Sequence, residues 1–197
     1  MICRKSDSES IFIAADYIRR GKVVILPTDT VYGFSGIVDG RHYSYHTEQK
    51  ISEIKGREEG KRCIQLLSKP EDLKKYTRDL VPDELLSFWP GPLTIIVHTF
   101  EKDGNFATTA FRCPGDEWLR KLIAECGAPI YSTSVNKSGS APLNNLCEIK
   151  KEFGSAVDLI IDDGDKTSGV PSTIVALEED GTVKLVRQGQ IKLNCAL

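Results

Sequence analysis

The stretch KVVILPTDTVYGFSG, residues 22–36, joins a short apolar run to a polar loop. After Lys22, the residues Val-Val-Ile-Leu at 23–26 are apolar and mostly β-branched, and Pro27 closes the run. Such a run packs on both faces of a sheet and the proline ends the ladder, so the pattern predicts a buried strand. Asp29, flanked by two threonines, follows the strand, and Gly33 and Gly36 allow the backbone to turn or to approach a bound molecule. Taken alone, the polar part also fits an ordinary turn between two strands.

Two further polar groups each stand beside a segment with a buried pattern. Lys55-Gly56-Arg57 ends a helical pattern, and Ser134-Val135-Asn136 follows a short apolar strand. Together with the loop PTDTVYG, they resemble the YrdC-like family of threonylcarbamoyl-AMP synthases, whose pattern is a Pro-Thr-acid-Thr-Val-Tyr-Gly loop, a Lys-x-Arg pair and a Ser-x-Asn. The resemblance runs from about Gly21 to Ile191 and depends on the number of blocks in order. The other blocks are WPGPLT at 89–94, Arg112-Cys113-Pro114, Ser138-Gly139, PSTIV at 171–175 and Arg187-Gln188-Gly189.

Length and charge limit the classes of function. A chain of 197 residues suits one domain with its own core, so we expect residues 1–197 to form a single domain. The net charge of −2 gives no argument for nucleic acid binding by the whole surface. No stretch resembles a transmembrane run or a secretory signal, so we expect a cytoplasmic protein without a membrane partner. Six basic residues can still form a local groove for a polyanionic small molecule: Lys55, Arg57, Lys61, Arg62, Arg112 and Arg187.

The residues that bind metals in proteins are scattered along the chain. The six cysteines form no Cys-x-x-Cys and stand next to no histidine, which argues against zinc and favours reduced thiols over three disulfides. His42 and His46 belong to a polar segment and are expected to be solvated. The acidic run at residues 162–165 lacks a downstream ligand at calcium-loop spacing, so it is interpreted as a turn. We therefore expect no metal site built by the chain.

Helical and strand patterns alternate along the chain, which predicts an α/β (α+β) protein with a twisted, open, mixed β-sheet flanked by helices. The helix-like segments are residues 6–20, 49–55, 70–75, 82–88, 116–125 and 148–153. The strand-like segments are residues 22–26, 34–38, 62–68, 93–98, 106–112, 129–133, 157–161, 172–177 and 183–187. Two strands that end in small polar loops indicate a ligand crevice, and hence a concave ligand face. The resemblance implies the YrdC-like (DHBP-synthase-like) fold.

The chain departs from the family pattern on both sides of the Lys-x-Arg pair. The segment at residues 39–45 makes the connection to the Lys-x-Arg pair longer than is usual in the family, which indicates an insertion. Glu58 and Glu59 stand where a proline usually follows the pair, while Lys61 still supplies a basic residue. The two glutamates are expected either to weaken anion binding there or to point to solvent and pair with nearby basic residues.

The resemblance implies an L-threonylcarbamoyladenylate synthase, which condenses L-threonine, bicarbonate and ATP to threonylcarbamoyl-AMP and pyrophosphate. Mg²⁺ is implied as an ion carried by ATP. The adenylate would serve a separate transferase that modifies the tRNA adenosine next to the anticodon. Such a reaction depends on holding a carbamate against the α-phosphate and on neutralising the triphosphate, so positioned cations and hydroxyls suffice without a nucleophile and base.

The resemblance also assigns roles to residues, position by position. Lys55, Arg57, Ser134 and Asn136 would surround the reacting centre as catalytic residues. The residues expected to contact threonine are Thr30, Arg112, Ser134 and Ser172. The residues expected to contact ATP are Arg57, Lys61, Thr108, Asn136, Asn144 and Arg187. Arginines suit bidentate contacts with phosphate, a lysine supplies a point charge, and an asparagine both donates and accepts.

Several alternatives stay open at this point. Ser134 and Ser138 can cap a helix, Arg112 can pair with a carboxylate at the edge of the core, and Asp29 can form an Asx-turn. At the level of function, a family relative can bind double-stranded RNA or tRNA, or assist ribosome assembly, without threonine chemistry. A carbamoyl-transfer enzyme of the hydrogenase-maturation type uses a related domain, but inside a much longer chain.

Overall fold

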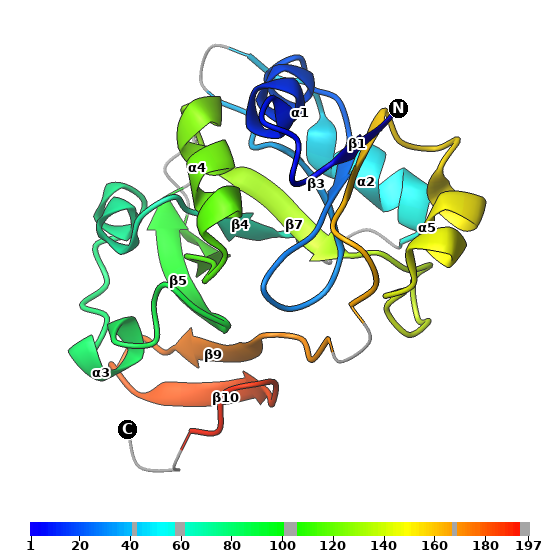
Figure 1. Ribbon diagram of the computed structural model, residues 1–197. Coiled ribbons are helices and arrows are strands. Elements are labelled where there is room, and N and C mark those ends of the chain that lie inside the picture. The colour runs from blue at the N-terminus through cyan, green and yellow to red at the C-terminus, as the bar shows by residue number, and fades with distance from the viewer. Residues whose placement is uncertain (41–42, 58–61, 101–105, 167–168, 194–197) are drawn as a thin grey trace.

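The computed structural model describes residues 1–40, 43–57, 62–100, 106–166 and 169–193, which form a mixed sheet and its covering helices (Figure 1). The strands are β1 (Ile2–Arg4), β2 (Val24–Leu26), β3 (Gly33–Ile37), β4 (Ile64–Leu66), β5 (Leu93–Phe100), β6 (Phe106–Arg112), β7 (Ile130–Ser134), β8 (Leu159–Asp162), β9 (Thr173–Leu177) and β10 (Val183–Arg187). The helices are α1 (Ser10–Arg19), α2 (Thr47–Lys55), α3 (Asp83–Leu86), α4 (Glu117–Cys126), α5 (Leu146–Phe153) and the 3₁₀ helix η1 (Pro70–Lys75).

The strands of the described part form one sheet in the order β1-β8-β2-β3-β7-β4-β6-β5-β9-β10. The sheet is mixed: it contains parallel pairs, such as β4 with β6 and β5 with β9, and antiparallel pairs, such as β3 with β7. The predicted fold class, a twisted open mixed sheet flanked by helices, is confirmed. β1 was not expected from the sequence, because only three residues pair with β8 and the polar segment that follows conceals them.

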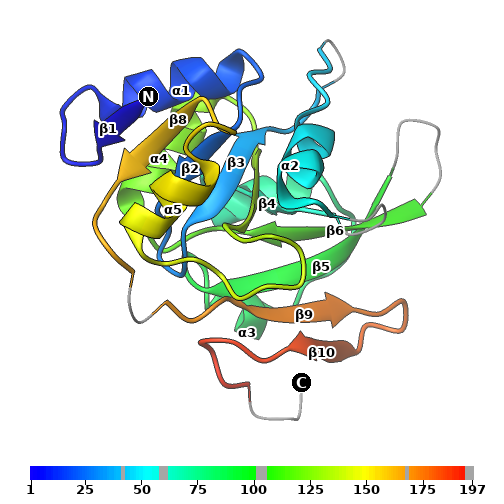
Figure 2. The same ribbon diagram turned by 90° about the vertical axis from the view of Figure 1, so that its right-hand side faces the viewer.

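Helices cover both faces of the sheet. On one face, Ile18 of α1 and Leu122 of α4 belong to a cluster with residues of β2, β3, β4, β7 and β8. On the other face, Ile51 of α2 and Phe153 of α5 pack against side chains that include Phe34 of β3. A third cluster joins residues of η1, α3, β5 and β9, and both views show β9 and β10 at the lower edge (Figures 1 and 2).

Local signals explain where the helices begin and end. Asp116 caps α4 by accepting a hydrogen bond from Leu119 N, and Asn145 caps α5 in the same way. Gly56 ends α2 in the left-handed conformation with φ of 60°, which glycine adopts without a steric penalty. The predicted end of the second helix is therefore confirmed, and it sets Lys55 and Arg57 on either side of a sharp turn.

The remaining structural expectations concern single residues and short turns. His98 is confirmed as a strand residue of β5, and its Nδ1 atom lies 3.0 Å from an Asp79 carboxylate oxygen. The run at residues 162–165 forms a turn in which Asp162 accepts a hydrogen bond from Gly164 N, as expected. Cys3, Cys63, Cys113, Cys126 and Cys147 are unpaired thiols, whereas Cys195 and His42 lie outside the described residues. Among the helices of the described part, none has the length and apolar character needed to cross a bilayer.

Candidate functional site

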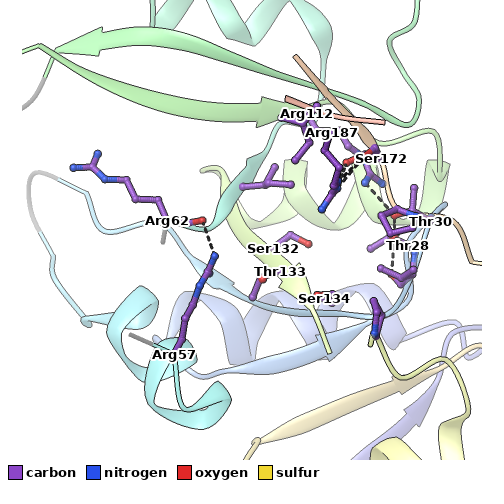
Figure 3. A pocket seen from close by; sticks show the side chains of 16 residues that line it. Thr28, Thr30, Arg57, Arg62, Arg112, Ser132, Thr133, Ser134, Ser172 and Arg187 are labelled. Atoms are coloured by element: carbon purple, nitrogen blue, oxygen red, sulfur yellow. Dashed lines mark hydrogen bonds between the residues drawn. The ribbon is translucent and has the colours of Figure 1, made fainter. Parts of the chain in front are cut away.

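A cavity of about 190 Å³ opens where β3, β4 and β7 meet β6 and the ends of β9 and β10. The pairing of β3 with β7 sets Gly33 opposite Ser134, so the loop before β3 and the loop after β7 meet at one place. Six residues predicted for the site line this cavity, and they come from positions 30 to 187 of the chain (Figure 3). They are Thr30, Arg57, Arg112, Ser134, Ser172 and Arg187.

Lys55 and Asn136 lie directly behind the cavity wall and contact each other. The Lys55 ammonium donates to Asn136 Oδ1 at 2.9 Å, to Asn136 O at 3.0 Å and to Ser134 O at 2.5 Å. The Ser134 hydroxyl donates to the same Asn136 Oδ1 at 2.6 Å. Burial lowers the pKa of Lys55 to about 8, with a smaller contribution from the charge of Arg57. The lysine is therefore a buried group that is still mostly protonated near pH 7, and it ties the Lys-x-Arg turn to the Ser-x-Asn loop.

Arg112 is almost fully buried at the end of β6 and pairs with Asp29. Its Nη2 atom donates to Asp29 Oδ1, and the other carboxylate oxygen accepts from Gly115 N at 2.8 Å. Burial lowers the pKa of the Arg112 guanidinium, and the adjacent carboxylate opposes this shift. Arg112 thus pairs with a carboxylate, as the alternative interpretation held, and it also lines the cavity. Its Nε atom is buried and has no hydrogen-bond partner among the described residues.

The hydroxyls of Thr28 and Thr30 continue this network. Arg112 Nη1 donates to Thr30 Oγ1 at 3.0 Å, and the two threonine hydroxyls lie 2.9 Å apart. Thr28 Oγ1 donates to Val31 O at 2.7 Å and accepts from the backbone N–H groups of Thr30 and Val31. Because the Thr28 proton is committed to Val31 O, the Thr30 hydroxyl is left to donate to Thr28 or to a bound molecule.

Ser172 and Arg187 complete the same end of the cavity. The guanidinium of Arg187 donates to Ser172 O through Nε at 3.3 Å and through Nη2 at 2.8 Å. The Ser172 hydroxyl lies 2.8 Å from the hydroxyl of Thr94, which is fully buried. Burial and the neighbouring charge of Arg112 both lower the pKa of Arg187. Two guanidinium groups therefore stand close together beside one carboxylate.

Arg57 approaches the cavity from the opposite side. Its Nη2 atom lies 3.5 Å from Arg62 O, and its Nη1 atom lies 3.9 Å from the sulfur of Cys63. Arg62, which was expected in a basic groove, also lines the cavity. Lys61 lies outside the described residues, as do Glu58 and Glu59.

Besides Lys55 and Asn136, two further predicted residues do not line the cavity. Thr108 pairs with His98 in the β5–β6 ladder, four positions before Arg112, and its side chain is exposed. Asn144 follows the cavity residue Pro142, and its backbone oxygen accepts from Lys166 N at 2.9 Å. The side-chain oxygen of Asn144 is buried and has no hydrogen-bond partner within the described part of the chain.

Other residues of the cavity were not singled out by sequence reasoning. Ser132 and Thr133 of β7 line it between Arg57 and Arg112, and Thr28, which the sequence indicated only as part of the polar loop, lines it near Thr30 (Figure 3). The hydroxyl-rich sequence YSTS at residues 131–134 was the available signal, because an ordinary buried strand would carry apolar side chains there. The further lining residues are Val31, Gly33, Ile64, Pro142, Pro171 and Ile174.

Sequence comparison identifies relatives of the chain. Residues 16–189 match the Sua5/YciO/YrdC sequence family, which carries the description "Telomere recombination". A threonylcarbamoyl-AMP synthase of Pyrococcus abyssi is 34% identical over 192 residues, which are 93% of this chain and 55% of that protein. A threonylcarbamoyl-AMP synthase of Thiobacillus denitrificans is 29% identical over 179 residues, 87% of this chain and 91% of the relative. The chain thus spans about half the length of the Pyrococcus relative and most of the Thiobacillus one.

Solved structures show the same architecture. The structure of P. abyssi Sua5 complexed with L-threonine superposes with a TM-score of 0.81 at 32% identity, covering 96% of this chain and 57% of that one. The structure of Escherichia coli YciO gives a TM-score of 0.79 at 25% identity, covering 96% and 93% of the two chains. The superpositions extend over nearly the whole chain described above.

Proposed function

The chain belongs to the Sua5/YciO/YrdC family, and from this premise we propose that it is an L-threonylcarbamoyladenylate synthase formed by a single domain, residues 1–197. It would condense L-threonine, bicarbonate and ATP to threonylcarbamoyl-AMP and pyrophosphate. The observation that carries the proposal is the convergence of Thr30, Arg57 and Arg187 on one cavity, although they lie far apart in the sequence. The names of the relatives favour this enzyme over an RNA-binding protein without threonine chemistry.

L-Threonine would bind beside Thr30, Arg112, Ser134 and Ser172. This group combines one guanidinium with three hydroxyls, which suits a carboxylate and a small polar side chain. Support comes from the relative whose structure contains L-threonine, since its fold covers 96% of this chain. The small volume of the cavity, about 190 Å³, also suits an amino acid.

ATP would extend from the same cavity over Arg57 and Arg187, with Asn136 and Lys55 near the reacting atoms. Lys61, Thr108 and Asn144 complete the proposed ATP contacts. No described residue that lines the cavity carries a carboxylate, so Mg²⁺ would enter bound to the triphosphate and be held by phosphate oxygens. Four arginines around the cavity would neutralise charge that accumulates on the phosphates.

The reaction itself would require positioning more than covalent participation by the protein. Threonine nitrogen and bicarbonate form a carbamate with loss of water, and a carbamate oxygen attacks the α-phosphate while pyrophosphate leaves. The fixed guanidinium groups and the Lys55 ammonium would hold the two anionic reactants together against their mutual repulsion. Asn136 is held by Lys55 and donates through Nδ2 to Lys137 O and Ser140 O, so its position is set before a substrate arrives.

The product would pass to a separate tRNA threonylcarbamoyl transferase, which acts on the adenosine next to the anticodon. The protein would act in the cytoplasm, where ATP, bicarbonate and tRNA are available. Binding of tRNA or double-stranded RNA by this chain itself is the alternative role.

The test is a reconstituted assay. Purified protein is incubated with L-threonine, bicarbonate and Mg-ATP, and pyrophosphate release and the mass of the adenylate are measured. Arg57→Ala should lower the rate by about a hundredfold, because it removes a cation from the phosphate region. Arg19→Ala removes an exposed arginine of α1 that pairs with Glu125 of α4, and it should leave the rate near that of the wild type. Absence of both threonine and ATP binding in the wild type would contradict the proposal.

A further inference from the structure

Two long side chains from opposite ends of α2 meet just before β4. Glu48, in the first turn of α2, accepts a hydrogen bond of 2.5 Å from Cys63 N. Arg57 follows the glycine that ends α2, and its guanidinium lies 3.5 Å from Arg62 O and 3.9 Å from Cys63 Sγ. The carboxylate and the guanidinium therefore contact the same short segment, residues 62 and 63.

The side chain of Arg57 reaches the cavity, whereas that of Glu48 does not. Arg57 lines the cavity and Glu48 is not among its lining residues. Figure 3 shows the Arg57 side chain extending from the end of α2 toward Arg62, with the contact to the Arg62 oxygen as a dashed line. The backbone of Arg57 is held by α2, since its N–H donates to Ser52 O at 2.9 Å. The direction of the guanidinium therefore depends on the segment against which the side chain rests.

Glu48 holds that segment through its backbone. Cys63 is only 3% exposed, and a buried N–H costs free energy unless it is hydrogen-bonded. The half-buried carboxylate of Glu48 supplies the acceptor, and bonds to a charged acceptor are stronger than neutral ones. Burial, with a contribution from the charge of Glu48, raises the pKa of the Cys63 thiol to about 12. The thiol is thus neutral near pH 7 and supplies no countercharge that would orient Arg57.

We propose that Glu48 is a positioning residue for Arg57. By fixing Cys63 N, it holds the surface on which the guanidinium rests and so orients the guanidinium toward the phosphates of ATP. A long side chain that is oriented before the ligand arrives loses less conformational entropy on binding. The inference rests on the proposed function and deepens it, because it gives the first turn of α2 a part in nucleotide binding.

The test compares the affinities of α,β-methylene ATP with Mg²⁺ and of L-threonine, measured by calorimetry at an ionic strength of about 0.15 M, at which exposed charges are screened. Glu48→Ala should weaken binding of the ATP analogue about tenfold and leave the affinity for threonine unchanged. Glu48→Gln should keep the wild-type affinity for both, since its amide oxygen can accept the same bond. Glu53→Ala removes another carboxylate from α2, one that accepts from Gln49 of the same helix, and should bind both ligands as the wild type does.

A double-mutant cycle shows whether Glu48 acts through Arg57. In the assay of adenylate formation, Glu48→Ala should lower kcat/KM for ATP about tenfold when Arg57 is present. In the Arg57→Ala background the same change should have little further effect, because the group that it misplaces is already absent. Equal effects in the two backgrounds would overturn the inference.

The outcomes also separate positioning from a purely structural role. A carboxylate in the first turn of a helix stabilises the helix through its dipole. If that were the whole role of Glu48, Glu48→Ala would lower stability and bind the ATP analogue as the wild type does, and this result would overturn the inference. Parallel weakening of both ligands, as a general disturbance of α2 would cause, would overturn it too.

Hydrogen exchange of the Cys63 amide provides a readout that needs no ligand. Exchange should be faster in Glu48→Ala than in Glu48→Gln, and equal rates would contradict the inference. If the wild type binds no ATP analogue, the proposed function fails, whereas the exchange rates still decide whether Glu48 holds the segment that supports Arg57.

Discussion

Lys55 Nζ donates a hydrogen bond of 2.9 Å to Asn136 Oδ1, although 81 positions separate the two residues in the chain. A second link, from Ser138 N to Lys55 O at 2.9 Å, joins the same two segments through their backbones. The end of α2 and the loop after β7 are therefore held as one unit. A change in the charge of Lys55 should affect both segments at once.

The pH dependence of nucleotide binding should report the charge of Lys55. Its pKa is lowered from 10.5 to about 8, so the ammonium group loses its proton as the pH rises through about 8. Above that pH, the affinity for ATP should fall because one positive charge near the phosphates is lost. Calorimetric titration between pH 6.5 and 9.5 measures this step. The step should be missing in Lys55→Met. It should be retained in Lys137→Met, because the wild-type Lys137 ammonium is exposed and contacts Ile54 O.

The free energy of unfolding should rise with pH over the range in which the affinity for ATP falls. Between pH 8 and 10.5 the lysine stays protonated in the unfolded chain and is neutral in the folded one, so the unfolded state binds more protons and the contribution of this group to stability rises with pH. From pH 7.5 to 9.5 the free energy of unfolding of the wild type should gain on the order of 2 kcal/mol relative to Lys55→Met. Urea denaturation of both proteins at each pH gives the difference. A difference that stays constant or shrinks would refute the pKa assigned to Lys55.

Thr28→Val should disturb the part of the cavity beside Thr30 and Arg112 while keeping its shape. The change removes the hydroxyl that accepts from Thr30 N and Val31 N, and two buried N–H groups lose their partner. We expect a loss of about 1–3 kcal/mol in the free energy of unfolding. The KM for threonine should rise more than that for ATP, as steady-state kinetics would show. Thr28→Ser restores the hydroxyl and should recover both properties, and equal damage by the two variants would contradict this account.

Gly36→Ala should displace α2 from the sheet. A Cβ atom at Gly36 would lie 2.3 Å from Thr47 Cγ2 and 3.2 Å from Lys22 O, so the first turn of α2 must move. The expected loss is about 1–3 kcal/mol in the free energy of unfolding, with lower activity because α2 ends at Lys55. Thermal and urea denaturation measure the loss. In the background of Thr47→Ser, which lacks the clashing methyl, the cost of Gly36→Ala should be clearly smaller.

Phe153→Ala should be strongly destabilising. The ring is 1% exposed and meets Phe34 edge to face, with 5.0 Å between the ring centroids. Its removal should cost about 3–5 kcal/mol in the free energy of unfolding, measured by urea denaturation. Phe12→Ala on α1 is the matched control, because that ring is 55% exposed and its removal should cost at most about 0.5 kcal/mol.

Much of the fold could be predicted because its signals are local. Ala14 and Ile18 recur at helical spacing and are fully buried in α1, and the apolar run before Pro27 contains β2. Element ends shifted by a few residues, as with the expected helix at 82–88, which became α3 at Asp83–Leu86. β1 escaped prediction because a three-residue strand has too short a pattern, and only its pairing with β8 defines it.

The candidate site was predictable where a motif block was complete. Thr30, Arg57 and Arg187 were chosen from such blocks, and they line the cavity. Asn144 was chosen from a loop of variable length and Thr108 from the strand that ends at Arg112, and neither of them lines the cavity. Ser132 was overlooked because its place in the wall follows from the pairing of β7 with β3 and β4, which no local pattern encodes.

Residue types along the chain were therefore enough to predict a mixed sheet, its main helices and the polar blocks at the strand ends, since periodicity, proline and glycine act over a few neighbouring residues. Folding in three dimensions was needed to bring Asp29 against Arg112 and Lys55 against Asn136. Those contacts join residues about eighty positions apart. They depend on strand order and register, which are set by packing across the whole sheet.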